Sequence, residues 1–220
     1  MENWVIVLPV LLFSVVIHEC AHALAAERCG DYTARMLGRI TLNPVPHIDP
    51  VGSILVPVIL LLTKSSIFFA WAKPVPVNPN NFRHPRRDDI IVSFAGPFSN
   101  LILSLIFAGL LLLTVILIST TSEISMWSRN LIQLLRYGVW INIVLAFFNL
   151  IPIPPLDGSH ILRNLLPYEA ARAYDSIQPY GFLILLVAIY FNLLSIFFIP
   201  ARWLFSGILK AVLVLSALVY

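Results

Sequence analysis

The segment His18-Glu19-Cys20-Ala21-His22 carries two histidines four residues apart, with a glutamate directly after the first. On an α-helix, positions i and i+4 lie on one face, so two imidazoles at this spacing can bind one metal ion. A glutamate beside them can take a proton from a water molecule at that metal. This HExxH pattern is typical of zinc hydrolases, and it predicts His18 and His22 as zinc ligands and Glu19 as the general base.

A third ligand must come from elsewhere, because a catalytic zinc usually has three protein ligands and one open position. Asp157 is the leading candidate, since it ends an apolar stretch and follows three prolines between residues 152 and 155. Prolines there prevent a regular helix, and freed backbone groups at membrane depth must line a cavity or be buried in protein. Asp49 is the comparable rival, and a simple turn leaving the membrane is the alternative for residues 155 to 158. The other aspartates are expected in solvated loops: Asp31, Asp88, Asp89 and Asp175.

The composition is that of a membrane protein. Of the 220 residues, 59% are hydrophobic and only 11% are charged, against roughly 25% charged residues in a soluble domain. The mean hydropathy is +0.90. Apolar blocks of about 20 residues, long enough to cross a bilayer, lie at 4–26, 51–72, 90–118, 133–156, 180–199 and 201–219. The sequence therefore predicts an all-α, multi-pass membrane protein with five or six transmembrane helices.

The charges and cysteines exclude several other classes. The net charge of +3 comes from Lys and Arg residues that mostly lie between the apolar blocks, as the positive-inside rule places them. No nucleic-acid partner is expected, and the lipid bilayer is the expected surrounding. Cys20 and Cys29 are too few for a disulfide framework. The first apolar block has no basic residue before it and contains the HExxH pattern, so we do not expect a removable signal peptide.

The chain is expected to form one membrane-embedded metalloprotease domain over residues 1–220. Its core would be residues 4–165, followed by a C-terminal helical hairpin at 180–219 with its break at Pro200 and Arg202. Residues 31–50 and 71–81 contain short β-compatible runs punctuated by Gly and Pro. We expect short membrane-associated strands there.

Three motifs resemble those of one known family. They are HECAH at residues 18–22, AGPFSN at 95–100 and NLIPIPPLDG at 149–158. Through them the chain resembles the site-2 proteases, intramembrane zinc metalloproteases, over most of residues 14–165. It is similar to the minimal members, because 220 residues leave no room for PDZ or CBS domains. It departs from the family pattern in the extra apolar block at 51–72.

The resemblance implies a set of site residues and a substrate class. It implies one zinc ion with three ligands, which are His18, His22 and Asp157, and a catalytic acid/base, Glu19. It implies a substrate-binding set of Asn149, Pro155 and, by motif position, Asn100. The implied substrate is a transmembrane protein, cleaved at a peptide bond in or near its membrane segment. Without the resemblance, a helix-packing amide is an alternative for Asn149.

The number of apolar blocks between His18 and Asp157 constrains the topology. If all six apolar blocks crossed the membrane, the first and fourth would be antiparallel, and His18 and Asp157, both late in their blocks, would lie on opposite sides. The block at 51–72 contains Pro57 and the polar break Thr63-Lys64-Ser65-Ser66, so we predict that it re-enters on one side. Nine of the twelve cations between blocks then share a side. The other three are Arg129, Arg136 and Arg202.

The positive-inside rule makes the side with nine cations cytoplasmic. We therefore expect a protein of a bacterial cell membrane with its N-terminus outside, its C-terminus inside and its zinc site toward the cytoplasmic side.

The other three histidines are not expected to bind the metal. His47 is expected to be a loop histidine bonded to backbone, whereas His84 and His160 are expected at the surface.

Three other functions fit the sequence less well. A metal-ion transporter would reuse the same His and Asp ligands, but ion paths usually need polar groups in several spans, and the last two blocks offer little beyond Asn192. A different membrane zinc protease would pair HExxH with a downstream glutamate, and none lies in a matching apolar setting: Glu27, Glu123 and Glu169. A catalytically inactive scaffold is disfavoured because the chemical residues are intact.

Overall fold

The computed structural model describes residues 4–62, 71–119 and 125–217, which are predominantly helical. Five segments in these residues are long and apolar enough to cross a membrane: Val7–Cys29, Pro85–Ser119, Met126–Asn149, Tyr168–Tyr190 and Leu193–Ala217. The predicted all-α membrane architecture is therefore confirmed.

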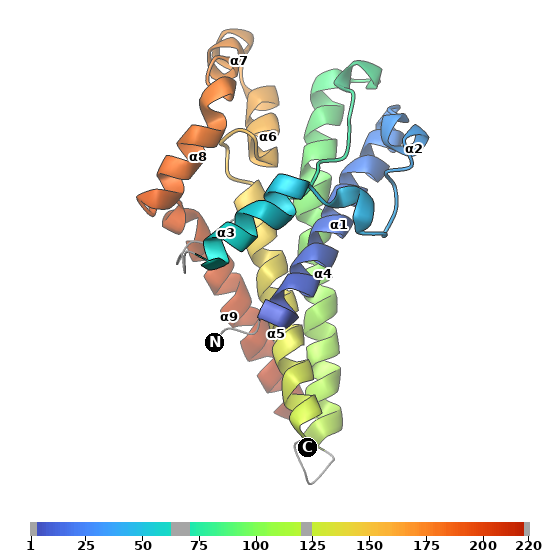
Figure 1. Cartoon of the computed structure of the whole chain (residues 1–220), viewed down its shortest axis with the longest axis vertical. Helices are drawn as coiled ribbons and strands as arrows, with labels where there is room; N and C mark the ends of the chain where they lie inside the picture. The colour runs from blue at the N-terminus through green and yellow to red at the C-terminus, as the bar shows by residue number, and fades with distance from the viewer. Residues whose placement is uncertain (1–3, 63–70, 120–124, 218–220) are drawn as a thin grey trace.

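Three long helices form the centre of the molecule (Figure 1): α1 (Trp4–Cys29), α4 (Pro85–Ser119) and α5 (Met126–Asn149). Early in α1, Ser14 meets Asn100 of α4, whereas later in α1, His22 meets Val92. These pairs show that α1 and α4 are antiparallel. Because α4 and α5 are also antiparallel neighbours (Figure 1), α1 and α5 run in the same direction, as predicted from the number of apolar blocks.

A buried polar cluster joins the three helices. Ser14, Asn100 and Asn142 are each fully buried. The Asn142 amide donates to Ser14 Oγ at 2.9 Å, and the Asn100 amide donates to Asn142 Oδ1 at 2.9 Å and to the Ser14 carbonyl at 3.3 Å. Polar groups among apolar helices are costly unless they are paired. The cluster therefore sets the register of α1, α4 and α5.

A buried aspartate ties the loop after α1 to the segment before α4. Asp31 precedes α2 (Thr33–Met36) and accepts hydrogen bonds from the Asn78 backbone at 2.7 Å and the Asn81 amide at 2.7 Å. Burial alone would raise the pKa of Asp31, but these bonds and those from Thr33 outweigh it and hold that pKa below its usual value.

The expectation that Asp31 and Asp88 lie in solvated loops is wrong. Asp31 is 0% exposed and Asp88 is 5% exposed. Asp88 accepts a hydrogen bond from the His84 backbone at 2.8 Å, in the first turn of α4. Both carboxylates satisfy backbone N–H groups at turns, a role that is not visible from their polar neighbours in the sequence.

Between α1 and α4 the chain forms short helical pieces: η1 (Val45–His47), the π-helical turn η2 (Pro50–Leu55), α3 (Val56–Leu62) and η3 (Pro79–Asn81). Asp49 caps η2 by accepting hydrogen bonds from Val51 at 3.0 Å and Gly52 at 2.7 Å.

His47 is fully buried, and its ring bonds the Thr41 carbonyl at 3.1 Å. The prediction of a histidine bonded to backbone is confirmed.

The β-strands expected in residues 31–50 and 71–81 are absent from the part of the chain that the structure describes. Residues 71–78 have no regular secondary structure, and Pro74 and Pro76 lack N–H groups that a sheet ladder needs. The carbonyls of Lys73 and Pro74 instead accept hydrogen bonds from the Arg39 guanidinium at 3.0 and 3.2 Å. A side chain thus takes the place of a partner strand.

After α5 come α6 (Asp157–Leu165), α7 (Tyr168–Asp175), η4 (Gln178–Tyr180), α8 (Gly181–Tyr190), η5 (Leu193–Phe197) and α9 (Phe198–Ala217). Leu185 of α8 belongs to one hydrophobic cluster with Ile151, just beyond α5. Ala201 of α9 clusters with Val139, and Val212 clusters with Leu135. Residues 181–217 thus pass once along α5, toward its beginning.

This path differs from the expected hairpin at 180–219. Figure 1 shows α8 and α9 as successive segments, with α9 below α8 and beside α5. The break lies at Asn192, which has a positive φ of 55°, and not at Pro200. Pro200 falls in the first turn of α9, where a missing N–H leaves no helical hydrogen bond unmade.

We predict that Asn142→Ala destabilises the helix bundle, because it leaves the Ser14 and Asn100 side chains short of a buried partner. The expected loss is about 1–2 kcal/mol of unfolding free energy, measured as a lower Tm in detergent. Asn130→Ala is the matched control, since Asn130 is exposed on the same helix. If the two variants had the same Tm, the buried polar cluster would not contribute to the stability of the helix bundle.

Candidate metal centre

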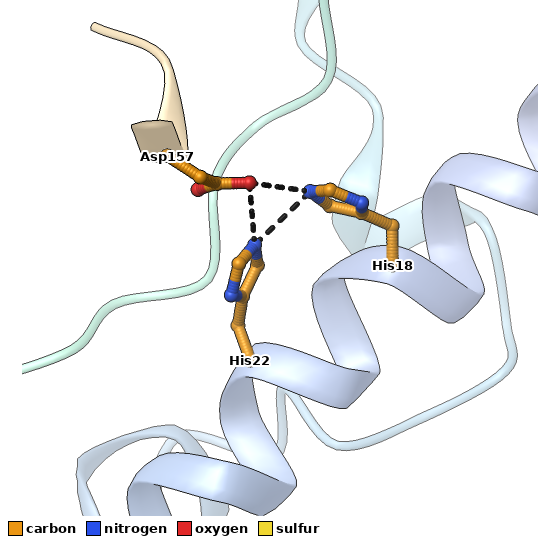
Figure 2. Close-up of side chains that lie close together, drawn as sticks. All are labelled: His18, His22 and Asp157. Atoms are coloured by element: carbon orange, nitrogen blue, oxygen red, sulfur yellow. Dashed lines mark hydrogen bonds and ion pairs between the residues drawn. The ribbon is translucent and has the colours of Figure 1, made fainter. Parts of the chain in front are cut away.

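Three potential ligand side chains converge between α1 and the start of α6 (Figure 2). His18 Nε2 lies 3.2 Å and His22 Nε2 lies 3.3 Å from Asp157 Oδ2, and the two Nε2 atoms are 3.0 Å apart. The ligand atoms all lie within 4.8 Å of one another. Residues separated by 135 positions in the sequence can therefore share one ion.

The other ring nitrogen of each histidine is held by an oxygen acceptor. His18 Nδ1 lies 2.6 Å from Asn100 Oδ1, and His22 Nδ1 lies 2.7 Å from the Val92 carbonyl. The Asn100 amide nitrogen donates to Asn142 and Ser14, so its oxygen faces His18. In each histidine Nδ1 is therefore the donor, and Nε2 keeps a free lone pair for a metal.

The donor set fits a zinc ion. Asp157 Oδ2 is buried and has no hydrogen-bond donor. With both imidazoles neutral and each Nδ1 the donor, three acceptor atoms face one another, and a zinc ion among them satisfies all three. Two imidazoles and one carboxylate are a ligand set of catalytic zinc, which keeps a fourth position open. Within the described residues, this is the one cluster of its kind.

The chain unwinds just before Asp157, as the prolines predicted. α5 ends at Asn149 and α6 begins at Asp157, with turns between them. A Cβ on Gly158 would lie 2.2 Å from the Leu150 carbonyl oxygen, so the glycine lets α6 start against the end of α5. This close approach places the Asp157 carboxylate over the α1 histidines. Asp49, the rival, is used as a cap for η2.

Glu19 lies beside the histidines and faces a neighbouring segment. Its Oε2 accepts a hydrogen bond from the Val75 backbone N–H at 2.7 Å. That contact orients the carboxylate and leaves the second oxygen for another proton donor. The Glu19 side chain also lines both cavities at the metal centre.

Two adjoining cavities of about 500 and 290 Å³ meet at the cluster. The residues that line both are His18, Glu19, Pro74, Asn149 and Pro155. The Asn149 amide nitrogen donates to the Leu145 carbonyl of its own helix at 3.0 Å. Asn149 and Pro155 thus lie at the cavities, whereas Asn100 is buried behind His18 and lines neither.

Three residues at the site received no role from the sequence. A Cβ on Gly96 would lie 2.4 Å from His22 Nε2 and 2.6 Å from His18 Nε2, so this glycine of the AGPFSN motif makes room for both rings.

His160 and Asp89 both line the smaller cavity. His160 Nδ1 lies 3.6 Å from Asp89 Oδ2, and the Asp89 carboxylate raises the pKa of His160. The spacing Asp157-x-x-His160 on one helix face could have indicated that position.

Comparison with known proteins now identifies the family. The profile of peptidase family M50 matches residues 112–189. YwhC of Bacillus subtilis strain 168, named as a candidate zinc metalloprotease, is 41% identical over 177 residues, which are 80% of this chain and 76% of YwhC. The chain belongs to peptidase family M50. It is a zinc metalloprotease of the site-2 protease family and a membrane protein.

Other relatives of this M50 protease agree. Rip2 of Mycolicibacterium smegmatis, also named as a candidate zinc metalloprotease, is 29% identical over 203 residues, covering 92% of this chain and 71% of Rip2. Zinc metalloprotease MJ0392 of Methanocaldococcus jannaschii is 23% identical over 194 residues, covering 87% of this chain and 44% of that protein. No solved structure matches the chain.

We predict that Gly96→Ala expels the metal from this M50 protease, because the added methyl group would overlap both Nε2 atoms. Zinc affinity, measured by chelator competition, should fall on the order of 10-fold or more. Gly109→Ala on the same helix is the control, since its Cβ would meet nothing within 4 Å. Retention of zinc by the Gly96 variant at the affinity of the Gly109 variant would contradict the geometry.

Proposed function

We propose that this metalloprotease hydrolyses a peptide bond in or near the transmembrane segment of another membrane protein. The observation that carries the proposal is the position of the ligand cluster: His18 lies 14 residues into α1, roughly 21 Å from its start, within a segment apolar enough to cross a bilayer. A substrate must therefore reach the cluster at membrane depth.

One zinc ion is assigned to His18, His22 and Asp157, whose three acceptor atoms face a common point. When bound there, zinc supplies Lewis acidity toward water and toward a peptide carbonyl. The protein holds both imidazoles in the required tautomer through Asn100 and the Val92 carbonyl.

Glu19 is assigned the proton transfers. Its Oε2 is held by the Val75 N–H, so Oε1 is the oxygen that takes a proton from the attacking water. The same carboxyl group then gives that proton to the nitrogen of the leaving amine, which completes hydrolysis without a change in the enzyme. Apolar side chains around the cavity limit the access of other water molecules to the reacting groups.

The larger cavity fits an apolar substrate segment. Its wall includes Phe148, Phe182 and Leu185, and it reaches His18 and Glu19. Asn149 and Pro155, which line both cavities, are assigned to the substrate backbone. Pro74 lines both cavities, and Val75 and Val77 line the smaller one. The main chain at Val77 is assigned to an unwound substrate. Asn100 is reassigned from substrate binding to the orientation of His18.

Metal transport is not favoured. Within the described residues, the only cluster of three potential ligands is the one at His18. A transit path needs successive polar groups through several spans.

For the topology, we propose that residues 51–72 enter and leave on one side. Support comes from both ends of the block: the Trp71 N–H donates to the Gly52 carbonyl at 3.2 Å, and Ser53 Oγ donates to the Trp71 carbonyl at 2.8 Å. The antiparallel order of α1 and α4 also leaves no net crossing between them. The side of the metal centre is assigned to the cytoplasm of a bacterial cell by the nine cations.

The single pass of residues 181–217 along α5 places Ala217 at the same end of the molecule as Met126. That end is the outer side in the proposed topology. The inner C-terminus expected from the sequence required that the blocks at 180–199 and 201–219 each cross the membrane. The candidate span Tyr168–Tyr190 is divided into α7, η4 and α8. α8 alone has 10 residues and is roughly 15 Å long, too short to cross a core of about 30 Å, so α8 and α9 are assigned to one crossing.

Proteolysis of a panel of single-span membrane proteins in liposomes tests the proposed activity. Glu19→Gln should keep its zinc and lose cleavage by about 10²–10⁴-fold, the usual worth of a positioned general base. Glu169→Gln is the matched control, because Glu169 is an exposed residue of α7. Cleavage at the wild-type rate by the Glu19 variant would rule out the assigned base.

Labelling of single cysteines from either side of sealed vesicles tests the topology. With Cys20 and Cys29 replaced by alanine, Met36→Cys and His84→Cys should react from the same side and Met126→Cys from the other, because all three positions are exposed. Labelling of positions 36 and 84 from opposite sides would refute a re-entrant 51–72.

A further inference from the structure

A third cavity, of about 640 Å³, lies between α5 and α9, away from the metal centre. Its polar lining consists of three arginines, a glutamine and a tyrosine: Arg129, Gln133, Arg136, Tyr137 and Arg202. The three arginines converge from two helices, because Arg129 and Arg136 are seven residues apart on one face of α5 and Arg202 comes from the neighbouring α9 (Figure 1). No ligand of the proposed zinc site lines this cavity.

The arginines of this cavity lack acidic partners in the described part of the chain. Elsewhere, Arg35 pairs with Glu27 and Arg163 pairs with Asp175. Among the described residues, no ion pair includes a cavity arginine and no carboxylate lines the cavity. Cations in a membrane-spanning helix are costly unless they face a partner or water. The cavity therefore carries three positive charges that an anion would neutralise.

The position along α5 points to the lipid headgroup layer. Arg129 and Arg136 lie roughly 5 and 15 Å from the start of α5, and helical side chains point toward the N-terminus of their helix. The two guanidinium groups are thus directed toward the membrane surface at that end. Of the cations between the apolar blocks, nine are assigned to the cytoplasmic side of the membrane and these two arginines, with Arg202, to the other side. The positive-inside rule therefore does not explain why three arginines lie there.

We propose that this cavity binds the phosphodiester group of an anionic membrane lipid. Guanidinium groups match phosphate oxygens in a two-pronged geometry and form strong charge-assisted hydrogen bonds. Trp140 and Phe205, whose ring centroids are 5.0 Å apart, line the same cavity and provide an apolar wall for the glycerol and the first acyl carbons. A soluble phosphate shares the anionic chemistry but would leave that wall unused.

The test is native mass spectrometry of the zinc-loaded full chain with phosphatidylglycerol or phosphatidylcholine. Wild type should retain phosphatidylglycerol in preference. Because a cation near an anionic membrane surface contributes about fivefold in affinity, the triple variant Arg129→Gln, Arg136→Gln, Arg202→Gln should bind it on the order of 100-fold more weakly. The matched control removes the same charge from exposed positions outside the cavity: Arg86→Gln, Arg87→Gln and Arg172→Gln.

The remaining arms separate the outcomes. The triple Arg→Lys variant keeps the charges, so it should retain more phosphatidylglycerol than the Gln variant, and the single Gln variants report the effect if the triple variant does not fold. Equal retention of the two lipids, or equal loss in the control, would overturn the proposal. Displacement of phosphatidylglycerol by inorganic phosphate at equal concentration would show a soluble-anion site instead. Lipid retention is measured without proteolysis. The lipid-binding test can therefore be interpreted even if the proposed proteolytic activity is not found.

Discussion

The arrangement of the helices in this molecule brings three potential metal ligands, two imidazole nitrogens and one carboxylate oxygen, to a common point. His18 Nε2, His22 Nε2 and Asp157 Oδ2 lie 3.0–3.3 Å from one another. When both imidazoles are neutral, as metal binding requires, these three atoms repel one another in apolar surroundings unless a cation lies among them. Each nitrogen is held in this state from behind, by Asn100 for His18 and by a carbonyl for His22. The affinity of the site for a metal therefore depends on helix contacts well away from the ion.

The same constraint fixes the order of the helices. Asp157 reaches the histidines only if α5 runs parallel to α1, and α4 lies antiparallel between them in the chain. The Ser14–Asn100–Asn142 cluster locks that arrangement, and Gly96 and Gly158 permit the close approaches that it needs. One polar network thus both stabilises the helix bundle and holds His18 in its ligand tautomer.

Part of this arrangement was predictable from sequence, because hydrophobic length and HExxH spacing are local properties. The histidine pair, the unwound stretch before Asp157 and the parallel first and fourth blocks follow from them. Other features depend on tertiary contacts that periodicity does not encode. Arg39 replaces a β-partner for residues 73–74, and Asp31 is held by hydrogen bonds from Asn78 and Asn81. Residues 181–217 pass once along α5 because their apolar residues pack there.

X-ray absorption spectroscopy of the zinc-loaded protein can identify the atoms that bind the ion. We expect nitrogen and oxygen ligands at about 2.0–2.1 Å, with two imidazoles among them, and the loss of one oxygen ligand in Asp157→Ala. A sulfur neighbour at about 2.3 Å, as Cys20 or Cys29 would supply, or an unchanged set of ligand atoms in the Asp157 variant, would contradict this assignment.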